Sequence, residues 1–425
     1  MFAFPSLLPS LLLAAQLAAA PAAPPAEVRA ALVETAPAPL TLSEAVTRAR
    51  RASPRRRAAT ALVDGAREAL RVAGRPPNPI LDLRTENWPG SRGPAWPGLD
   101  LFAELTQPIE LGGRRGIRRA LAAAESERAN RALGSLERQA ALEAAQAYMR
   151  ALKARVLVDT LAANGEGLST LVASVGRRVA EGYSPEADLL KLKTEAARIE
   201  GDSTRARLEM ERSLAVLTVV VGAEAPIQAA QLVEPPPLPP PDLAAGAIAD
   251  AVARHPDLLA AGAELERARQ LAAFERARRL PEPLLTGGYK RSAGLGTMVF
   301  GVSVAVPIFD RNEALVAQAL GRERAAAAER DVLAYELERE AAALIRAAST
   351  MVDQAERAPL ELLAPAENVR RAARAAFREG ATDVLALVDA ERVYRDVLRV
   401  ALELRLDALL AAIEARFAVG EEALP

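Results

Sequence analysis

The sequence predicts a mostly α-helical fold with a small β part, built as two similar halves. Ala, Leu, Arg and Glu dominate the 425 residues, and aromatic residues make up only 4%. These residue types favour helices that pack through seams of small and medium side chains. Two short segments depart from this composition, because apolar residues alternate in them with small or polar ones. Proline and glycine landmarks then recur at a nearly constant separation along the chain.

The two alternating segments lie at residues 99–107 and 297–306. Successive side chains of a strand point to opposite faces, so each segment is predicted to form a strand with one apolar and one mostly small or polar face. Phe102 and Val299 are exceptions on the polar face. The apolar rows are Leu99, Leu101, Ala103 and Leu105 in the first segment and Met298, Phe300, Val302, Val304 and Val306 in the second.

A further short strand is predicted just before each alternating segment, so that the pairs form hairpins over residues 80–107 and 284–306. Pro108 and Pro307 mark the end of each hairpin, because proline cannot donate to a sheet ladder. The loop of the first hairpin is flanked by Trp88 and Trp96. These tryptophans suit an interfacial belt beside a bilayer, and they equally suit a cover over the hairpin.

Long helices are predicted to follow each hairpin. Residues 113–176 contain no proline, and at ~1.5 Å per residue such a helix is on the order of 90 Å long, unless Gly165 and Gly167 interrupt it. Further helices are predicted from Thr41, as N-cap, to about residue 74 with a break at Pro54, and over residues 242–280 and 312–376. A last helix is predicted to follow its cap at Thr382 and to end near residue 419.

Two helical hairpin tips are predicted, at residues 182–185 and 380–383. In the first, Gly182 suits the end of one helix, Ser184 the N-cap of the next and Pro185 its first helical position. The second tip repeats this order, with Gly380 as the stop and Thr382 as the cap.

The two halves align through their landmarks. Pro54 matches Pro256 at an offset of 202 residues, and Pro108 matches Pro307 at 199. We interpret this as a tandem duplication. The predicted organisation is a signal peptide at 1–20, a flexible lead-in at 21–40, a first repeat at 41–233, a proline-rich linker at 234–241, a second repeat at 242–419 and a tail at 420–425.

Composition excludes several classes of function. The net charge of −1 predicts no affinity for nucleic acid. The chain has no cysteine and a single histidine, His255, which excludes a site of several histidines or thiolates within one chain. No phosphate loop or catalytic constellation is present, so we expect no enzyme activity, no metal site and no cofactor.

The two-faced strands point instead to a membrane. An open sheet edge in lipid costs several kcal/mol for each unpaired backbone group, so such a sheet must close. Transmembrane barrels need at least about eight strands, whereas one chain supplies four. Closure therefore requires other copies of the chain, and two or three satisfy the count. The apolar row would face lipid and the polar row a water-filled lumen, with the helical hairpins hanging below.

These residues carry a resemblance. The segments Leu105–Arg114 (LTQPIELGGR) and Val304–Asn312 (VAVPIFDRN), the opening TLSEA from Thr41, and the two Glu-Gly tips resemble TolC-type outer-membrane efflux proteins, and more the CzcC heavy-metal branch than the drug-efflux branch. The likeness covers nearly everything from Thr41 onward. This sequence lacks the lipid-anchor cysteine that some relatives carry.

The resemblance implies a homotrimer with a shared twelve-stranded β-barrel and a periplasmic helical tunnel, in the outer membrane of a Gram-negative bacterium. It implies docking to a periplasmic membrane-fusion adaptor, itself attached to an inner-membrane efflux pump of the RND type. The protein would then be a passive duct that carries metal ions or small molecules outward, in contact with outer-membrane lipid. The alternative is a soluble periplasmic coiled-coil adaptor or scaffold, which leaves the apolar strands unexplained.

The candidate functional residues follow from this arrangement. Asp188 and Asp389 are candidates for a tunnel constriction, or they are ordinary solvated acids. Asp389 matches one of the two acidic ring positions of drug-efflux relatives, while Ala386 occupies the second ring position. Arg114, Arg115, Arg118 and Arg119 mark the membrane–water boundary or form a solvated helix face. The remaining candidates are Asp100, Glu104, Thr106 and Ser303 for the lumen lining, Gly182, Ser184, Pro185, Gly380, Thr382 and Asp383 for adaptor docking, and Pro108 and Pro307 for the strand-to-helix junction.

Overall fold

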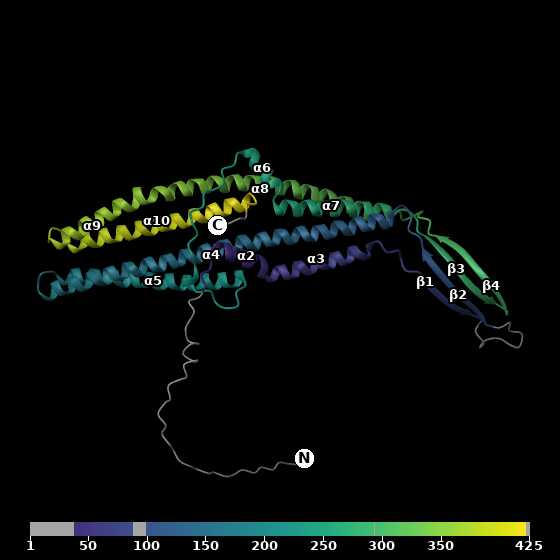
Figure 1. The fold of residues 1–425 in the computed structure, drawn as a ribbon, viewed down its shortest axis with the longest axis horizontal. Helices are drawn as coiled ribbons and strands as arrows, with labels where there is room; N and C mark the ends of the chain where they lie inside the picture. The colour runs from purple at the N-terminus through teal and green to yellow at the C-terminus, as the bar shows by residue number, and fades with distance from the viewer. Residues whose placement is uncertain (1–37, 88–98, 293, 422–425) are drawn as a thin grey trace, which may run out of the picture.

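The computed structural model describes residues 38–87, 99–292 and 294–421. The molecule is elongated, with a four-stranded sheet at one end and two helical hairpin tips at the other (Figure 1). The predicted signal peptide, most of the lead-in, both tryptophans and most of the tail lie outside the described residues.

The same order of elements occurs in both halves of the chain: two helices, two strands, a long helix and a returning helix. The first half comprises α2 (Leu42–Ala52), α3 (Pro54–Ala73), β1 (Ile80–Glu86), β2 (Asp100–Pro108), α4 (Arg114–Ala180) and α5 (Glu186–Val221). After a short 3-10 helix (Ala229–Gln231), the second half comprises α6 (Ala245–Ala253), α7 (Pro256–Ala277), β3 (Pro283–Ser292), β4 (Leu295–Val304), α8 (Glu313–Ala358), a π-helical turn (Pro359–Leu363), α9 (Ala364–Arg378) and α10 (Val384–Ala418).

Prolines divide the helices that precede each hairpin. Thr41 caps α2 as predicted, because its hydroxyl accepts the Glu44 N–H at 3.2 Å. The break at Pro54 is confirmed. The single helix predicted over 242–280 is wrong, because the chain breaks before Pro256, where His255 is extended and caps α7 by accepting the Asp257 N–H at 3.3 Å. A residue before proline is driven out of the helical region, which explains the break.

The long helices run further than the sequence indicated. α4 contains 67 residues without interruption, so Gly165 and Gly167 do not break it. The helix after β4 runs through Pro359 by widening into one π-helical turn before α9 begins. A proline removes one backbone donor, and a π-turn accommodates the shifted hydrogen bonds without ending the helix.

The sheet is antiparallel throughout, in the order β1-β2-β3-β4. Its central pair, β2 and β3, joins the two halves of the chain and aligns Leu105 with Gly287. β4 ends at Val304, two residues before the predicted end at Val306. Within the described part of one chain the sheet is open, and β1 and β4 are its edges.

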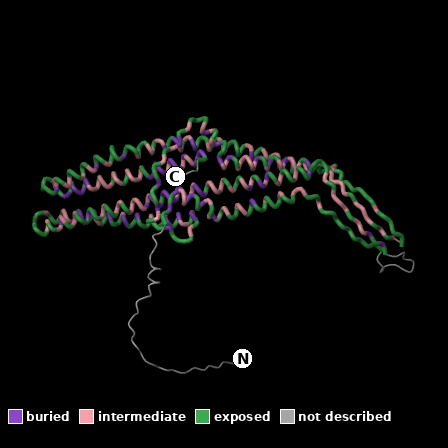
Figure 2. The backbone as a smooth tube through the Cα atoms, viewed as in Figure 1, coloured by how far each residue is buried: buried purple, intermediate pink, exposed green. Residues whose placement is uncertain are grey.

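The densest core lies where the helical hairpins meet in the middle of the molecule (Figure 2). Tyr148 of α4 is fully buried there, and its hydroxyl lies 2.7 Å from the Leu40 carbonyl oxygen and accepts the Val233 N–H at 2.8 Å. Burial raises the pKa of this phenol to about 12. Leu40 and Leu232 form a parallel bridge beside it, so both ends of the first half are fastened to α4.

Among the helices of the described segments, none combines the length and the apolar character needed to cross a bilayer.

Candidate functional site

The sheet has one apolar, exposed face. The register places the apolar rows of all four strands side by side: Leu81 lies opposite Leu105, and Gly287 lies opposite Phe300. Leu83 and Phe300 are 70% and 79% exposed, although both are large and apolar. Exposed contiguous apolar surface of this kind marks an interaction with lipid or protein. The exposed apolar side chains of this face are Leu81, Leu83, Leu101, Leu105, Leu285, Met298, Phe300, Val302 and Val304.

The opposite face carries the residues predicted to line a lumen. Asp100, Glu104 and Thr106 alternate along β2, and the register sets Ser303 of β4 on the same face. The Thr106 hydroxyl lies 2.9 Å from that of Thr286. The Asn87 amide donates to Asp100 at 2.8 Å, and Asp100 itself is buried. These contacts join polar side chains of β2 to a polar side chain of β3 and to the residue that follows β1.

Phe102 was the exception on this polar face, and the register explains it. Arg84 of β1 and Lys290 of β3 lie directly opposite it. Their charged groups lie 4.7 and 4.8 Å from the centre of the ring, so the ring is covered from both sides and only 7% exposed. Cations over an aromatic face stabilise such an arrangement. The polar face therefore presents charge even where it carries Phe102.

Arginines at the start of α4 bind the ends of two other helices. Arg114 donates from Nε to the Ala277 carbonyl oxygen at 3.1 Å and pairs with Glu282 at 2.9 Å. Arg118 donates to the Ala73 carbonyl oxygen at 2.7 Å. Arg114 is buried, so its assignment to a solvated helix face is wrong. Cations stabilise the negative end of a helix dipole, and here they fix α3 and α7 against α4.

The two prolines predicted at the strand-to-helix junction lie at the end of a strand or just past it. Pro108 is the last residue of β2, six residues before α4 begins. Pro307 lies past the end of β4 and before α8.

The two hairpin tips share one backbone geometry. Gly182 and Gly380 have φ values of 78° and 73°, a left-handed conformation that glycine adopts without strain. In each tip the next residue donates its N–H to the carbonyl five residues back, at 2.8 Å. This closes the preceding helix in a Schellman motif.

The helix caps after the tips differ from the prediction. Pro185, not Ser184, is the N-cap of α5, and the helix begins at Glu186. Asp383, not Thr382, caps α10, because its carboxylate accepts the Ala386 N–H at 2.9 Å. A carboxylate one position later outcompetes the threonine hydroxyl. Tyr183, which sequence reasoning passed over, is 74% exposed at the first tip.

The candidate constriction acids differ in their surroundings. Asp188 lies in the first turn of α5, and its carboxylate is 3.5 Å from the ammonium of Lys191. Asp389 lies on an exposed face of α10. The two are not in contact within the chain.

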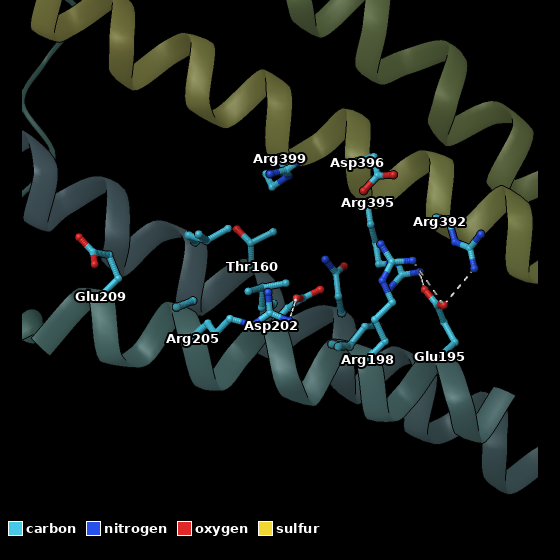
Figure 3. A pocket seen from close by; sticks show the side chains of 15 residues that line it. Thr160, Glu195, Arg198, Asp202, Arg205, Glu209, Arg392, Arg395, Asp396 and Arg399 are labelled. Atoms are coloured by element: carbon cyan, nitrogen blue, oxygen red, sulfur yellow. Dashed lines mark hydrogen bonds and ion pairs between the residues drawn. The ribbon is translucent and has the colours of Figure 1, made fainter.

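A charged cluster that the sequence did not reveal joins the two helical hairpins. Glu195 of α5 is buried and accepts hydrogen bonds from Arg392 at 3.0 Å and from Arg395 at 2.6 Å (Figure 3). Burial alone would raise the pKa of this carboxyl, but the hydrogen bonds from Arg395 and Arg392 outweigh it and hold the pKa below its ordinary value. The cluster lines a cleft of about 410 Å³ between α4, α5 and α10.

The residues that the structure describes include no group of three or more histidine or acidic side chains that could hold a metal ion. What the geometry offers is a two-faced sheet continuous with long helical hairpins.

Comparison with known proteins bears on this arrangement. The family model described as "Outer membrane efflux protein" matches residues 247–421, from α6 to the end of α10. The chain is therefore similar to outer membrane efflux proteins, and the match of the family model lies in its second half. The resemblance first drawn from the strand-proline-turn segments and the tips is thereby confirmed, together with the fold of mostly helix and a small four-stranded part.

Individual relatives agree with the family. The chain is 27% identical over 361 residues to the cobalt-zinc-cadmium resistance protein CzcC of Cupriavidus metallidurans, covering 83% of this chain and 84% of that protein. Its fold is similar to CusC, with a TM-score of 0.78 at 20% identity over 89% of this chain and 92% of that one. It is similar to the outer-membrane channel OprN, with a TM-score of 0.73 at 19% identity over 90% and 91%.

The proteins that the chain is similar to are described as an outer membrane efflux protein in the case of the family model and as an outer-membrane channel in the case of OprN.

Proposed function

We propose that three copies of this chain form the passive outer-membrane duct of a tripartite efflux system, which carries metal ions or small molecules from the periplasm or the pump to the exterior. The observation that carries the proposal is the open, two-faced sheet at the end of the helical hairpins. Its edges β1 and β4 have no further strand beside them among the residues that the structure describes, and its apolar face is exposed. Because open edges are not tolerated in lipid, pairing of β4 with β1 of the next copy completes the structure.

The polar face then lines the duct. In this proposal Asp100, Glu104, Thr106 and Ser303 face water, with Arg84 and Lys290 adding positive charge around Phe102. Mixed charge of this kind favours a wide, weakly selective path over a binding site. The duct itself performs no catalysis, and the partner pump supplies the energy.

The far end is proposed to dock the periplasmic adaptor, which is attached to an RND-type pump. Both tips present the same left-handed glycine turn, so one adaptor geometry fits both. The proposed docking residues are Gly182, Ser184, Pro185, Gly380, Thr382 and Asp383. Asp188 and Asp389, one or two turns above the tips, are proposed to form acidic rings in the assembled tunnel, and Pro108 and Pro307 to mark where barrel passes into tunnel.

The name of the relative CzcC refers to resistance to cobalt, zinc and cadmium, and divalent metal ions are therefore the proposed cargo. With no cysteine and one histidine in the sequence, the duct would pass such ions without coordinating them.

The absence of cysteine makes the proposal directly testable. In the otherwise cysteine-free chain, Ser303→Cys places one thiol on the polar face of β4, and Phe300→Cys places one on the apolar face. After reconstitution in planar bilayers, we expect a charged, membrane-impermeant thiol reagent to reduce the conductance of the Ser303 variant and to leave the Phe300 variant unchanged.

A soluble periplasmic adaptor is the competing function. If this function is correct, the mature chain should stay in solution without detergent, should be monomeric and should show no conductance in bilayers. That result, or equal modification of both cysteine variants, would remove the channel proposal.

A further inference from the structure

A cleft close to the two tips lies between the first helical hairpin and the second (Figure 1). Its volume is about 560 Å³, and α4, α9 and α10 line it. On each helix the lining residues recur every three or four positions, so one face of each helix is turned toward the cleft. On α4 these residues include Gly167, Leu171, Ser174 and Arg178.

The base of the cleft is apolar. Leu168 of α4, Phe377 of α9 and Leu387 of α10 line it, and each is at most 8% exposed. All three belong to the apolar cluster that packs the two hairpins against each other near the tips. The cleft therefore offers buried apolar surface to the body of a ligand, and both hairpins contribute that surface.

Positive charge lines the same cleft. Among the described residues that line it, five arginines accompany a single acidic residue, Glu391. The adjoining cleft at Glu195 is different, because four acidic side chains accompany five arginines there. The surplus of positive charge is therefore a property of the cleft beside the tips. Its arginines are Arg178, Arg370, Arg374, Arg378 and Arg395.

Three of these arginines are compensated by carboxylates within the protein. The pairs are Arg374 with Glu391, Arg395 with Glu195 at 2.6 Å, and Arg370 with Glu367 at 3.0 Å. The Nε–H of Arg370 is nevertheless buried without a hydrogen-bond partner in the described part of the chain. A buried donor that lacks an acceptor costs free energy.

The other two arginines, Arg178 and Arg378, have no acidic partner among the described residues. The guanidinium group of Arg178 lies 5.1 Å from the centre of the Phe377 ring. Arg378 donates from Nε to the Arg374 carbonyl oxygen at 3.4 Å. The cleft thus holds two uncompensated positive charges, one from each hairpin, next to its apolar base.

We propose that this cleft binds a small amphipathic organic anion, with a flat apolar body and one carboxylate or sulfonate group. The body would lie on Phe377 and its apolar neighbours, and the anionic group would accept hydrogen bonds from the guanidinium groups of Arg178 and Arg378. An inorganic anion would leave the apolar base uncovered, and a neutral apolar molecule would leave both charges uncompensated.

Such a ligand would bridge the two hairpins. Leu168 and Arg178 belong to the first hairpin, whereas Phe377 and Arg378 belong to the second. A molecule that contacts all four residues opposes the separation of the hairpins near their tips. Binding requires only the folded hairpins, so it can be measured apart from conductance.

The test uses the full-length protein, purified in neutral detergent, and isothermal titration calorimetry against a blank of the same detergent. The probes are 2-naphthoate, its neutral analogue 2-naphthamide, and acetate, which carries the carboxylate alone. We expect 2-naphthoate to bind at least about tenfold more tightly than either of the others, because it combines charge-assisted hydrogen bonds with buried apolar surface. It should also raise the midpoint of thermal unfolding, since a ligand that binds the folded state stabilises it.

Two variants and one control locate the binding site. Arg178→Gln breaks no ion pair within the described residues and should weaken the binding of 2-naphthoate about tenfold. Gly167→Leu fills the cleft without a change of charge and should abolish binding. It should fold, because a Cβ at Gly167 meets no atom within 4 Å and leucine favours the helix. The matched control Arg177→Gln removes the same charge from the neighbouring exposed residue and should bind as the wild type does.

Three results would overturn the proposal. Equal affinity for 2-naphthoate and either of the other probes would exclude an amphipathic anion as the ligand. Equal weakening in Arg177→Gln and Arg178→Gln would show that only net charge matters, and unchanged binding in Gly167→Leu would exclude this cleft. Conductance in planar bilayers is measured in parallel: intact conductance without binding refutes only this inference, whereas binding without conductance refutes only the proposed channel.

Discussion

The buried carboxylate of Glu195 should hold the two helical hairpins together in the periplasmic part of the molecule. It is the shared acceptor of Arg392 and Arg395, so Glu195→Gln removes its negative charge and weakens two charge-assisted hydrogen bonds at once. A hydrogen bond to a charged group contributes roughly 1.5–3 kcal/mol, and Arg392 regains hydration because its side chain is 44% exposed. We expect a net loss of about 2 kcal/mol from the contact between α5 and α10.

A loss of this size changes the local opening equilibrium roughly thirtyfold, since about 1.4 kcal/mol corresponds to a factor of ten. The assay places spin labels at Lys193 of α5 and Val393 of α10, both exposed, and measures their distance distribution by double electron–electron resonance. In wild type at neutral pH we expect one narrow distance. In Glu195→Gln we expect a broad distribution that includes longer distances.

The control is Glu209→Gln, which removes an exposed acid from the same cleft. The same contact should depend on pH. The pKa of Glu195 is lower in the folded protein than its ordinary value, so its contribution is complete above the ordinary pKa of about 4.3 and is lost as pH falls through the folded value. Identical distance distributions for the two variants at neutral pH would show that the Glu195 contacts do not hold the hairpins.

Three further expectations concern stability. Arg114→Ala should lower the free energy of unfolding by about 2–3 kcal/mol, because carbonyl groups at the end of α7 and the Glu282 carboxylate lose their partner. The control Arg322→Ala, on an exposed face of α8, should change it by under about 0.5 kcal/mol, and equal thermal unfolding of the two variants would contradict the capping role of Arg114. Tyr148→Phe should cost about 1 kcal/mol in urea unfolding, since the Val233 N–H loses its acceptor, and no change would mean that water replaces the hydroxyl. Gly182→Ala should lower the free energy of unfolding by about 1–2 kcal/mol, because alanine is strained at a φ of 78°. Gly165→Ala, in the interior of α4, should raise the free energy of unfolding by up to about 1 kcal/mol, and effects of the same sign would show that the tip does not require a glycine.

The features that the sequence predicted correctly depend on short-range patterns. The two faces of the sheet follow from a period of two residues, which is readable along a single strand, and both tips follow from one glycine each. The caps were misplaced by one residue because Ser184, Thr382 and Asp383 all suit an N-cap, and only the path of the chain decides among them.

The missed features depend on distant partners. Glu195 is one of many helical acids in the sequence, and nothing local distinguishes it, since Arg392 and Arg395 lie about 200 residues further on. The role of Arg114 was equally hidden, because it depends on where α7 ends in space. Phe102 could be explained only once the register placed a cation on each side of it.

The central pair of the sheet has a consequence for folding order. β2 pairs with β3, and the hydroxyls that meet there, on Thr106 and Thr286, are 180 residues apart in the chain. During N-to-C-terminal export, the hairpin of β1 and β2 emerges before β3. The backbone N–H and C=O groups on the free edge of β2 therefore remain unpaired until the second half has emerged. Contacts of such long sequence separation form slowly, and exposed strand edges aggregate in the meantime. A chain truncated at the proline-rich linker should therefore be a strong substrate for periplasmic chaperones.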